Sequence, residues 1–229
     1  MKINANFDKR VVVHSEELDW LQSPMKGVMR RPLDRVGEEV ARATTIVRYD
    51  PQSHFSAHTH TGGEEFLVLE GVFQDEHGDF PVGSYIRNPP GSSHTPGSDD
   101  GCTIFVKLWQ FEPGDRTHVR IRLDEADIAS DENGVRHTPL YQDDIETVAL
   151  YKLSPGAKLD LDAPGGAELL VVEGSLSETD DTLSARDWLR VPLHNRISAT
   201  AGPDGATVWA KTGHLAHIAD QIERLQNAS

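Results

Sequence analysis

Short apolar segments recur along the whole chain and are separated by clusters of turn residues. Four of them, rich in Val, Ile, Thr and aromatic residues, span 43–49, 66–72, 84–88 and 103–111. Segments of this length that alternate or run apolar between Gly, Pro, Asp and Asn are typical of antiparallel strands, not of strand–helix–strand units. The pattern therefore predicts an all-β protein built as barrels or sandwiches.

One segment near the C-terminus has a different period. Its apolar residues fall at helical spacing: Leu215, Ile218, Ala219, Ile222 and Leu225. This spacing predicts a short C-terminal helix that packs on the outside of the β-structure.

The chain also contains an internal repeat. The segment Gly62–Gly71 recurs as Gly165–Gly174, and the same offset carries Arg87 onto Arg190. A slip of one residue then pairs Lys107 with a second lysine, Lys211. A repeat that spans nearly the whole chain predicts two similar domains, at residues 1–115 and 116–229, with a seam near residues 112–125.

Four potential metal ligands occur in the first copy of the repeat. His58 and His60 are two residues apart, so on a strand they project to the same face. A Gly-Gly turn then lets the chain reverse and bring Glu64 alongside, and a Pro-Pro-Gly turn delivers His94 from another strand. Three imidazoles and one carboxylate are a ligand set suited to Fe, Mn, Ni, Cu or Zn.

The second copy has lost this ligand set. Glu64 corresponds to Ala167 and His94 to Ile197, while the segment matching the His pair falls near 161–164, with one gap of open placement and no histidine. We therefore expect one divalent metal ion per chain and a metal-free second domain that serves packing, a separate ligand or dimerisation. Asp162 in this segment is expected in an exposed loop.

Residues that are retained in both copies belong to the scaffold by the same reasoning. Arg87 and Lys107 keep their counterparts although the metal ligands are gone. We therefore predict a structural role for both side chains rather than a catalytic one.

Composition and charge exclude several classes of function. The net charge of −15 argues against direct nucleic-acid binding, which depends on Lys and Arg at the phosphates. No apolar run approaches the roughly 20 residues of a membrane span, and the first ten residues lack the core of a signal peptide. A cytoplasmic location is expected. The single cysteine, Cys102, excludes an internal disulfide and lies in an apolar segment typical of a buried strand.

The ligand spacings resemble the two sequence motifs of the cupin superfamily. The first motif runs from His58 through Glu64 to Gly71, and the second runs from Gly83 through Pro-Pro-Gly to His94. Only the final Asn of the second motif is replaced, by Ser98. The resemblance implies a double-stranded β-helix, or jelly-roll, barrel in each copy, and hence a duplicated bicupin with the metal on His58, His60, Glu64 and His94.

Residues 40–111 resemble more specifically the cupin domain of ChrR-type anti-sigma factors. The similarity rests on the segments 62–71, 87–96 and 107–111. In that family the cupin domain holds zinc on three His and one Glu and senses singlet-oxygen and peroxide stress, so the resemblance implies zinc here, with Fe, Mn or Ni as alternatives. The family's sigma-binding domain carries a Cys-x-x-Cys pair that this sequence does not contain, so we expect sensing without a sigma factor as partner.

An enzyme is the alternative function. The same motif resembles small cupin dioxygenases that cleave β-diketones and hydroxyaryl ketones with a His-bound iron. Phe66 and Val68 share the inward face of Glu64, which predicts an apolar pocket floor suited to a small organic ligand or effector. The sequence indicates no catalytic base beside the metal. A structural, seed-storage-like bicupin is a third possibility, and a homodimer is compatible with all three.

Overall fold

The computed structural model describes residues 1–38, 40–123, 129–130 and 133–228. The described chain forms antiparallel sheets and a short C-terminal α-helix, which confirms the all-β prediction. The helix α1 spans Ile218–Ala228 and follows a 3₁₀ turn at His214–His217, while a further 3₁₀ turn spans Ser15–Glu17. Residues 124 and 125 of the expected seam lie outside the described residues.

The chain divides into two compact units, and each includes a segment from the opposite end of the sequence. The first unit contains residues 1–5, 19–126 and 220–229, whereas the second contains residues 6–18 and 127–219. The repeat predicts a division at residues 1–115 and 116–229. It does not predict this exchange of segments, because neither exchanged segment carries a repeated motif.

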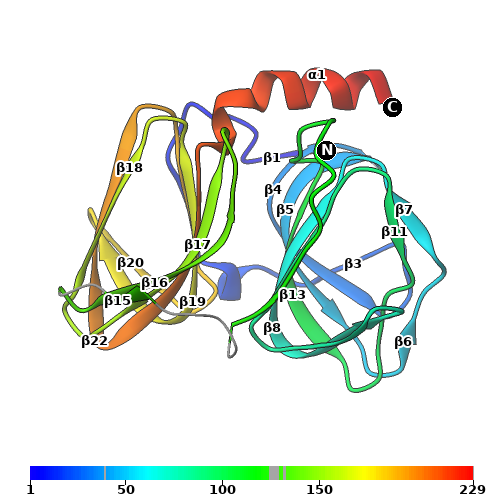
Figure 1. Ribbon diagram of the computed structural model, residues 1–229, viewed down its shortest axis with the longest axis horizontal. Coiled ribbons are helices and arrows are strands. Elements are labelled where there is room, and N and C mark those ends of the chain that lie inside the picture. Colours follow the sequence, from blue (N-terminus) through cyan, green and yellow to red (C-terminus); the bar gives the residue numbers. More distant parts are fainter. Residues whose placement is uncertain (39, 124–128, 131–132, 229) are drawn as a thin grey trace. The chain divides into compact units, whose positions relative to one another are not determined.

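The first unit is one curled sheet with a small two-stranded ladder beside it (Figure 1). The main sheet has the order β1-β4-β5-β13-β8-β10-β14, and β7 pairs with β11 separately. Its strands are β1 Lys2–Ile3, β3 Leu21–Gln22, β4 Val28–Gly37, β5 Ala41–Tyr49, β6 Ser53–His54, β7 His58–His60, β8 Glu64–Asp75, β9 Gly78–Pro81, β10 Ser84–Asn88, β11 Ser92–His94, β12 Gly97–Ser98, β13 Cys102–Leu108 and β14 Val119–Arg122.

The second unit repeats the same strand order. Its sheet runs β15-β16-β17-β22-β19-β21-β2, so the N-terminal strand β2 covers the edge of β21 as β14 covers the edge of β10. Pairing of this kind removes an open sheet edge from each unit. Its strands are β2 Val11–Val13, β15 Ala129–Ser130, β16 Val135–Gln142, β17 Thr147–Leu153, β18 Lys158–Ala163, β19 Ala167–Glu178, β20 Asp181–Ser184, β21 Trp188–Val191 and β22 Asn195–Thr212.

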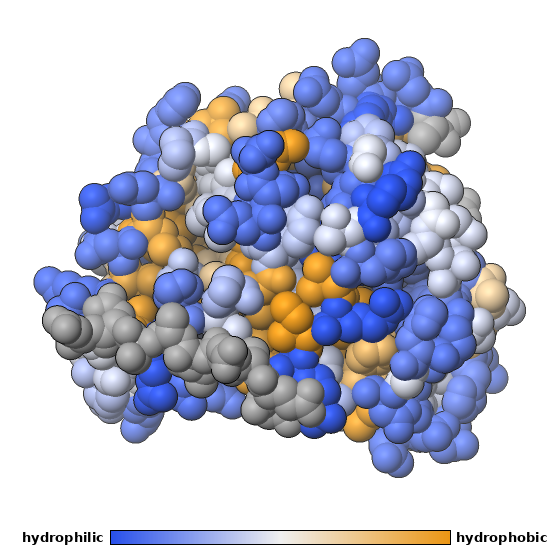
Figure 2. Space-filling view, viewed as in Figure 1, coloured by the Kyte–Doolittle hydropathy of each residue, from blue (hydrophilic) through white to orange (hydrophobic). Residues whose placement is uncertain are grey.

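Each unit has its own apolar core. The core of the first unit is aromatic at its centre, with Phe66 lying 4.6 Å from Phe73 between ring centroids. The core of the second unit is aliphatic, built mainly from Leu, Val, Ile and Ala of β18, β19, β21 and β22. Hydrophilic residues cover most of the face that Figure 2 shows, with smaller hydrophobic areas between them.

Strand register identifies the counterparts of the metal ligands in the second unit. In the first unit His94 on β11 lies opposite His58 on β7. In the second unit Ile197, the counterpart of His94, lies opposite Leu161 on β18. Leu161 is therefore the counterpart of His58, and the gap expected in this segment is not needed.

The same register places the neighbouring residues. Ala163 takes the place of His60, and Asp162 takes the place of the exposed Thr59. Asp162 was expected in a loop, but it belongs to β18, with 80% of its side chain exposed. The four metal-ligand positions of the first unit thus carry apolar residues in the second, and three of these are fully buried in its core.

A buried polar cluster recurs on the other face of both sheets. Glu65 accepts a hydrogen bond from Tyr85 and lies 3.5 Å from Arg87. In the second unit Glu168 accepts a hydrogen bond of 3.1 Å from Trp188. The repeated residues therefore make similar contacts in both units, as a duplicated scaffold would.

The retained basic residues and the cysteine make no contribution to the cavity described below. Arg87 pairs with Asp115 at 2.9 Å, and Lys107 donates to Thr44 at 3.0 Å. Both are bound to protein groups, which agrees with the structural role predicted for them. Burial raises the pKa of Cys102 to about 11, so this thiol stays protonated near neutral pH.

Candidate metal centre

Three strands bring the four predicted ligands together. His58 and His60 lie on β7, Glu64 begins β8, and His94 ends β11. The antiparallel pairing of β7 with β11 puts His94 directly opposite His58. The three imidazole ring centroids lie 4.7, 4.8 and 5.1 Å apart.

The Gly-Gly turn between β7 and β8 has no room for side chains. Gly63 has a φ of +78°, a backbone conformation that favours glycine. A Cβ atom on Gly62 would collide with the ring of Trp109, and one on Gly63 with the ring of Phe111. The two glycines therefore allow the tight reversal that sets Glu64 beside His60.

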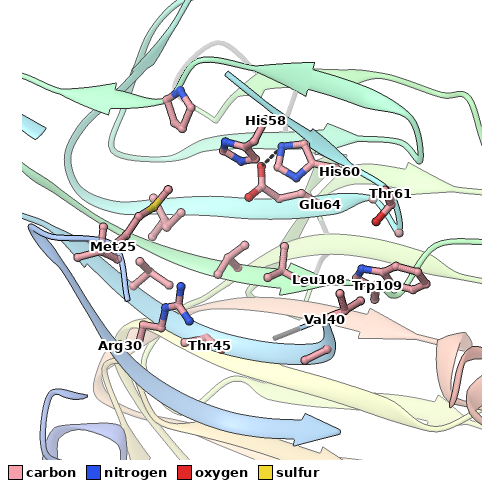
Figure 3. A pocket seen from close by; sticks show the side chains of 18 of the residues that line it. Met25, Arg30, Val40, Thr45, His58, His60, Thr61, Glu64, Leu108 and Trp109 are labelled. Atoms are coloured by element: carbon pink, nitrogen blue, oxygen red, sulfur yellow. Dashed lines mark ion pairs between the residues drawn. The ribbon is translucent and has the colours of Figure 1, made fainter. Parts of the chain in front are cut away.

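The geometry of the cluster fits a shared metal ion. Potential ligand atoms of His58, His60 and His94 lie within 4.8 Å of one another. The Oε2 atom of Glu64 lies 3.4 Å from Nε2 of His60 (Figure 3). The same oxygen lies 3.6 Å from Nε2 of His94. His60 Nε2 is buried and has no hydrogen-bond partner among the described residues. A buried polar atom of this kind is suited to coordinate a metal ion. These side chains could hold a metal ion.

Two further side chains hold the ligands in place. Asp75, the last residue of β8, lies 3.1 Å from Nδ1 of His94, so Nε2 of that ring faces the cluster. Asn88 donates a hydrogen bond of 3.3 Å to Glu64. Carboxylate and amide groups in such positions fix the orientation of metal ligands. The sequence analysis missed both, because their linear spacing does not relate them to the ligands.

The protonation of the cluster follows from burial and from these partners. Burial lowers the pKa of His60, although the charge of Glu64 opposes this effect. Burial also acts to lower the pKa of His94, but the hydrogen bond to Asp75 and the charge of Glu64 outweigh it and raise that pKa. Against burial, hydrogen bonds from His94 and the His77 backbone hold the pKa of Asp75 below its ordinary value. Asp75 is therefore a carboxylate near neutral pH.

Replacing Asp75 with asparagine should weaken metal binding without removing a ligand. We expect the affinity to fall by about 10–100-fold, because a neutral amide no longer fixes the His94 ring through a charged hydrogen bond. Competition titration with a metal indicator would measure this. Asp79→Asn is the control, since Asp79 contacts Gln74 on the exposed side of the same hairpin. An unchanged affinity in Asp75→Asn would show that Asp75 does not orient His94.

A cavity of about 300 Å³ reaches the ligand cluster from inside the first unit. Its wall is mainly apolar and is formed by Val28, Val47, Ile104, Val106 and Leu108, with Trp109 at one end. Phe66 and Val68, expected as the pocket floor, are not among the described lining residues, but they belong to the same apolar cluster as the wall residues Val28, Val47, Ile104 and Val106. They face inward as predicted, but aromatic side chains of β8 and β9 fill the space beside them.

Comparison with known proteins gives a family match over the first part of the chain. The model of the ChrR cupin-like domain matches residues 8–112. No curated protein matches the sequence. No helix among the described residues has the length and apolar character needed to cross a membrane.

Solved structures with the same fold cover most of the chain. A proposed dioxygenase from Nostoc punctiforme has a TM-score of 0.75 at 14% identity, over 91% of this chain and 84% of that one. The YlbA protein of E. coli has a TM-score of 0.69 at 13% identity, over 91% and 92%. An oxalate decarboxylase from Lactobacillus farciminis has a TM-score of 0.64 at 10% identity, over 88% and 85%. The chain therefore has the fold of these proteins, among them a conserved cupin barrel protein, and its residues 8–112 match the ChrR cupin-like domain.

Proposed function

We propose that this protein binds one divalent metal ion in its first unit and uses it to sense a small organic molecule, as a regulatory cupin. The observation that carries the proposal is the convergence of His58, His60, His94 and Glu64 next to a cavity of about 300 Å³, which the first two histidines and the glutamate line. A pocket of this size that combines an apolar wall with a few polar groups suits a small ligand.

Zinc is the metal that the ChrR resemblance supports. Three imidazoles and a carboxylate suit zinc, and the same set also accepts Fe, Mn or Ni. A bound ion would supply a positive charge and a coordination position for an oxygen donor of the ligand. The protein residues would orient that donor and exclude water from the apolar wall. A sigma factor as partner rests on the resemblance alone and is not part of this proposal.

The titratable groups of the cavity favour binding over acid–base chemistry. Three of the four candidate ligands line the cavity, all except His94. The other titratable side chains among the described lining residues are Arg30, Arg35 and Tyr49. Burial raises the pKa of Tyr49, so its hydroxyl stays protonated near neutral pH. None of the three is a general base under those conditions.

A dioxygenase is the second candidate, because the cavity opens directly onto the ligand cluster. An oxygenase needs this access for substrate and O₂, whereas a purely structural metal site is closed. The fold similarity to a proposed dioxygenase is compatible with this alternative.

Metal analysis and an oxygen electrode distinguish the two functions. Protein purified without added metal should contain about one zinc ion per chain and consume no O₂ with β-diketones or hydroxyaryl ketones. Iron in the protein, together with turnover that His94→Ala abolishes, would establish the enzyme instead. Two tightly bound ions per chain would contradict the assignment of a single site.

A further inference from the structure

A β-bulge turns two arginines toward the same cavity. Arg30 lies opposite Val47 and Arg35 opposite Ala43 on the neighbouring strand, with a register shift between Pro32 and Asp34. On an unbroken strand, residues 30 and 35 would face opposite sides of the sheet. The bulge adds one residue and brings both side chains to the cavity, which both of them line.

Arg30 has no anionic partner within the part of the chain that the structure describes. It makes no hydrogen bond or ion pair with any residue that the structure describes, and burial lowers its pKa. Arg35, by contrast, donates to the backbone oxygen of Glu38. A half-buried charge without a partner is unfavourable, so a site that keeps one is suited to an incoming anion. The chain has 37 acidic residues against 22 basic ones. The missing ion pair at Arg30 is therefore not explained by a shortage of carboxylates.

Candidate metal ligands line one side of the cavity, and Arg30 lines the other. Figure 3 shows Arg30 pointing from β4 into the cavity, on the wall opposite His58, His60 and Glu64. Glu64 is the acidic residue among the described lining residues, and it already contacts His60, His94 and Asn88. Apolar side chains of β4, β5 and β13 line the space between.

We propose that the ligand of this site is a small organic acid whose carboxylate binds Arg30 while an oxygen donor at its other end binds the metal. A guanidinium matches a carboxylate through paired hydrogen bonds. The apolar wall suits a carbon skeleton between the two ends and disfavours a free inorganic anion, which could not span the space. This inference rests on the metal site of the proposed function and adds the chemical class of the ligand.

Dicarboxylates of increasing length test the inference. Succinate, glutarate and adipate are titrated by calorimetry into the zinc-loaded protein, with the corresponding diamides as neutral controls. At least one dicarboxylate should bind, the diamides should not, and Arg30→Gln should weaken binding by about tenfold or more because the charged hydrogen bonds are lost. Arg48→Gln removes a charge from the adjacent strand, where Arg48 is exposed on the other face over Trp20, and should leave binding unchanged.

Two further readouts on the same samples separate the possible failures. Arg30→Gln should keep its metal and should melt no lower than the parent without ligand, since it removes an unpaired half-buried cation. A zinc-loaded parent that binds none of the three acids, or an Arg30→Gln variant that binds them equally well, overturns the inference alone. A parent that holds no metal overturns the metal site and the inference together.

Discussion

Replacing His60 with alanine is expected to remove most of the metal affinity of the protein. His60 Nε2 is buried at the centre of the cluster, 3.4 Å from Glu64 Oε2. A metal that binds only the folded chain adds about 2.7 kcal/mol of stability when free metal exceeds the Kd by about 100-fold. The variant should lose this contribution, which lowers the melting temperature of the metal-loaded protein by on the order of 10 °C.

The chelator response separates loss of metal from loss of packing. Chelator should lower the melting temperature of the parent, whereas His60→Ala should melt at the same temperature with and without it. Metal content per chain is measured in parallel.

Asp162→Ala is the control in the second unit. Asp162 is 80% exposed and pairs with Arg196 at 3.4 Å on the surface, so its loss should cost about 0.5 kcal/mol or less. Its metal content should equal that of the parent. If Asp162→Ala lost the metal and His60→Ala retained it, the site would not lie in the first unit.

The grouping of the four candidate ligands could be predicted from the sequence because most of its geometry is local. His58 and His60 are two residues apart on one short strand, so the strand period alone puts them on the same face. Glu64 follows a Gly-Gly turn that dictates a reversal. Only His94 needs information from another strand, and the second motif supplies it through the similarity to known cupins.

The groups around the ligands could not be predicted in this way. Asp75 reaches His94 only because β8 continues for twelve residues beyond the turn. Arg30 faces the cavity together with Arg35 only because of the bulge in β4. The proline at this bulge, Pro32, is the signal that could have indicated it, because proline inside a sheet is confined to edges and bulges. Such contacts depend on register, which the hydrophobic pattern leaves open where both faces of a strand are buried.

The exchange of terminal segments between the two units could not be predicted from the sequence either. Residues 6–18 contain an apolar Val run that fits any sheet edge, and the structure places it on β21 of the second unit. The C-terminal helix was predicted from its period and is confirmed, yet the period does not say which unit it covers. The structure assigns residues 220–229 to the first unit, where Gln221 and Leu225 are buried.

Replacing Arg42 with alanine should destabilise the first unit by about 3–5 kcal/mol. Arg42 is fully buried and lies 3.3 Å from the carboxylate of Asp34, which is also fully buried. Its Nη2 donates to Gln110 at 3.0 Å, and its Nε donates to Gln221 of α1 at 3.0 Å. Alanine would leave the Asp34 charge without its cationic partner and would remove the side chain that ties α1 to the sheet. Urea denaturation followed by fluorescence measures the loss.

Two comparisons show whether the buried charge pair carries this effect. Arg196→Ala breaks an ion pair that is 59% exposed on the arginine side, so it should change the free energy of unfolding by about 0.5 kcal/mol or less. Replacing Arg42 and Asp34 together with leucine should recover part of the loss, because no unpaired charge then remains in the core. If the double variant is as unstable as Arg42→Ala, the loss comes from the empty space and the detached helix. If Arg42→Ala costs no more than Arg196→Ala, the first unit does not depend on the pair.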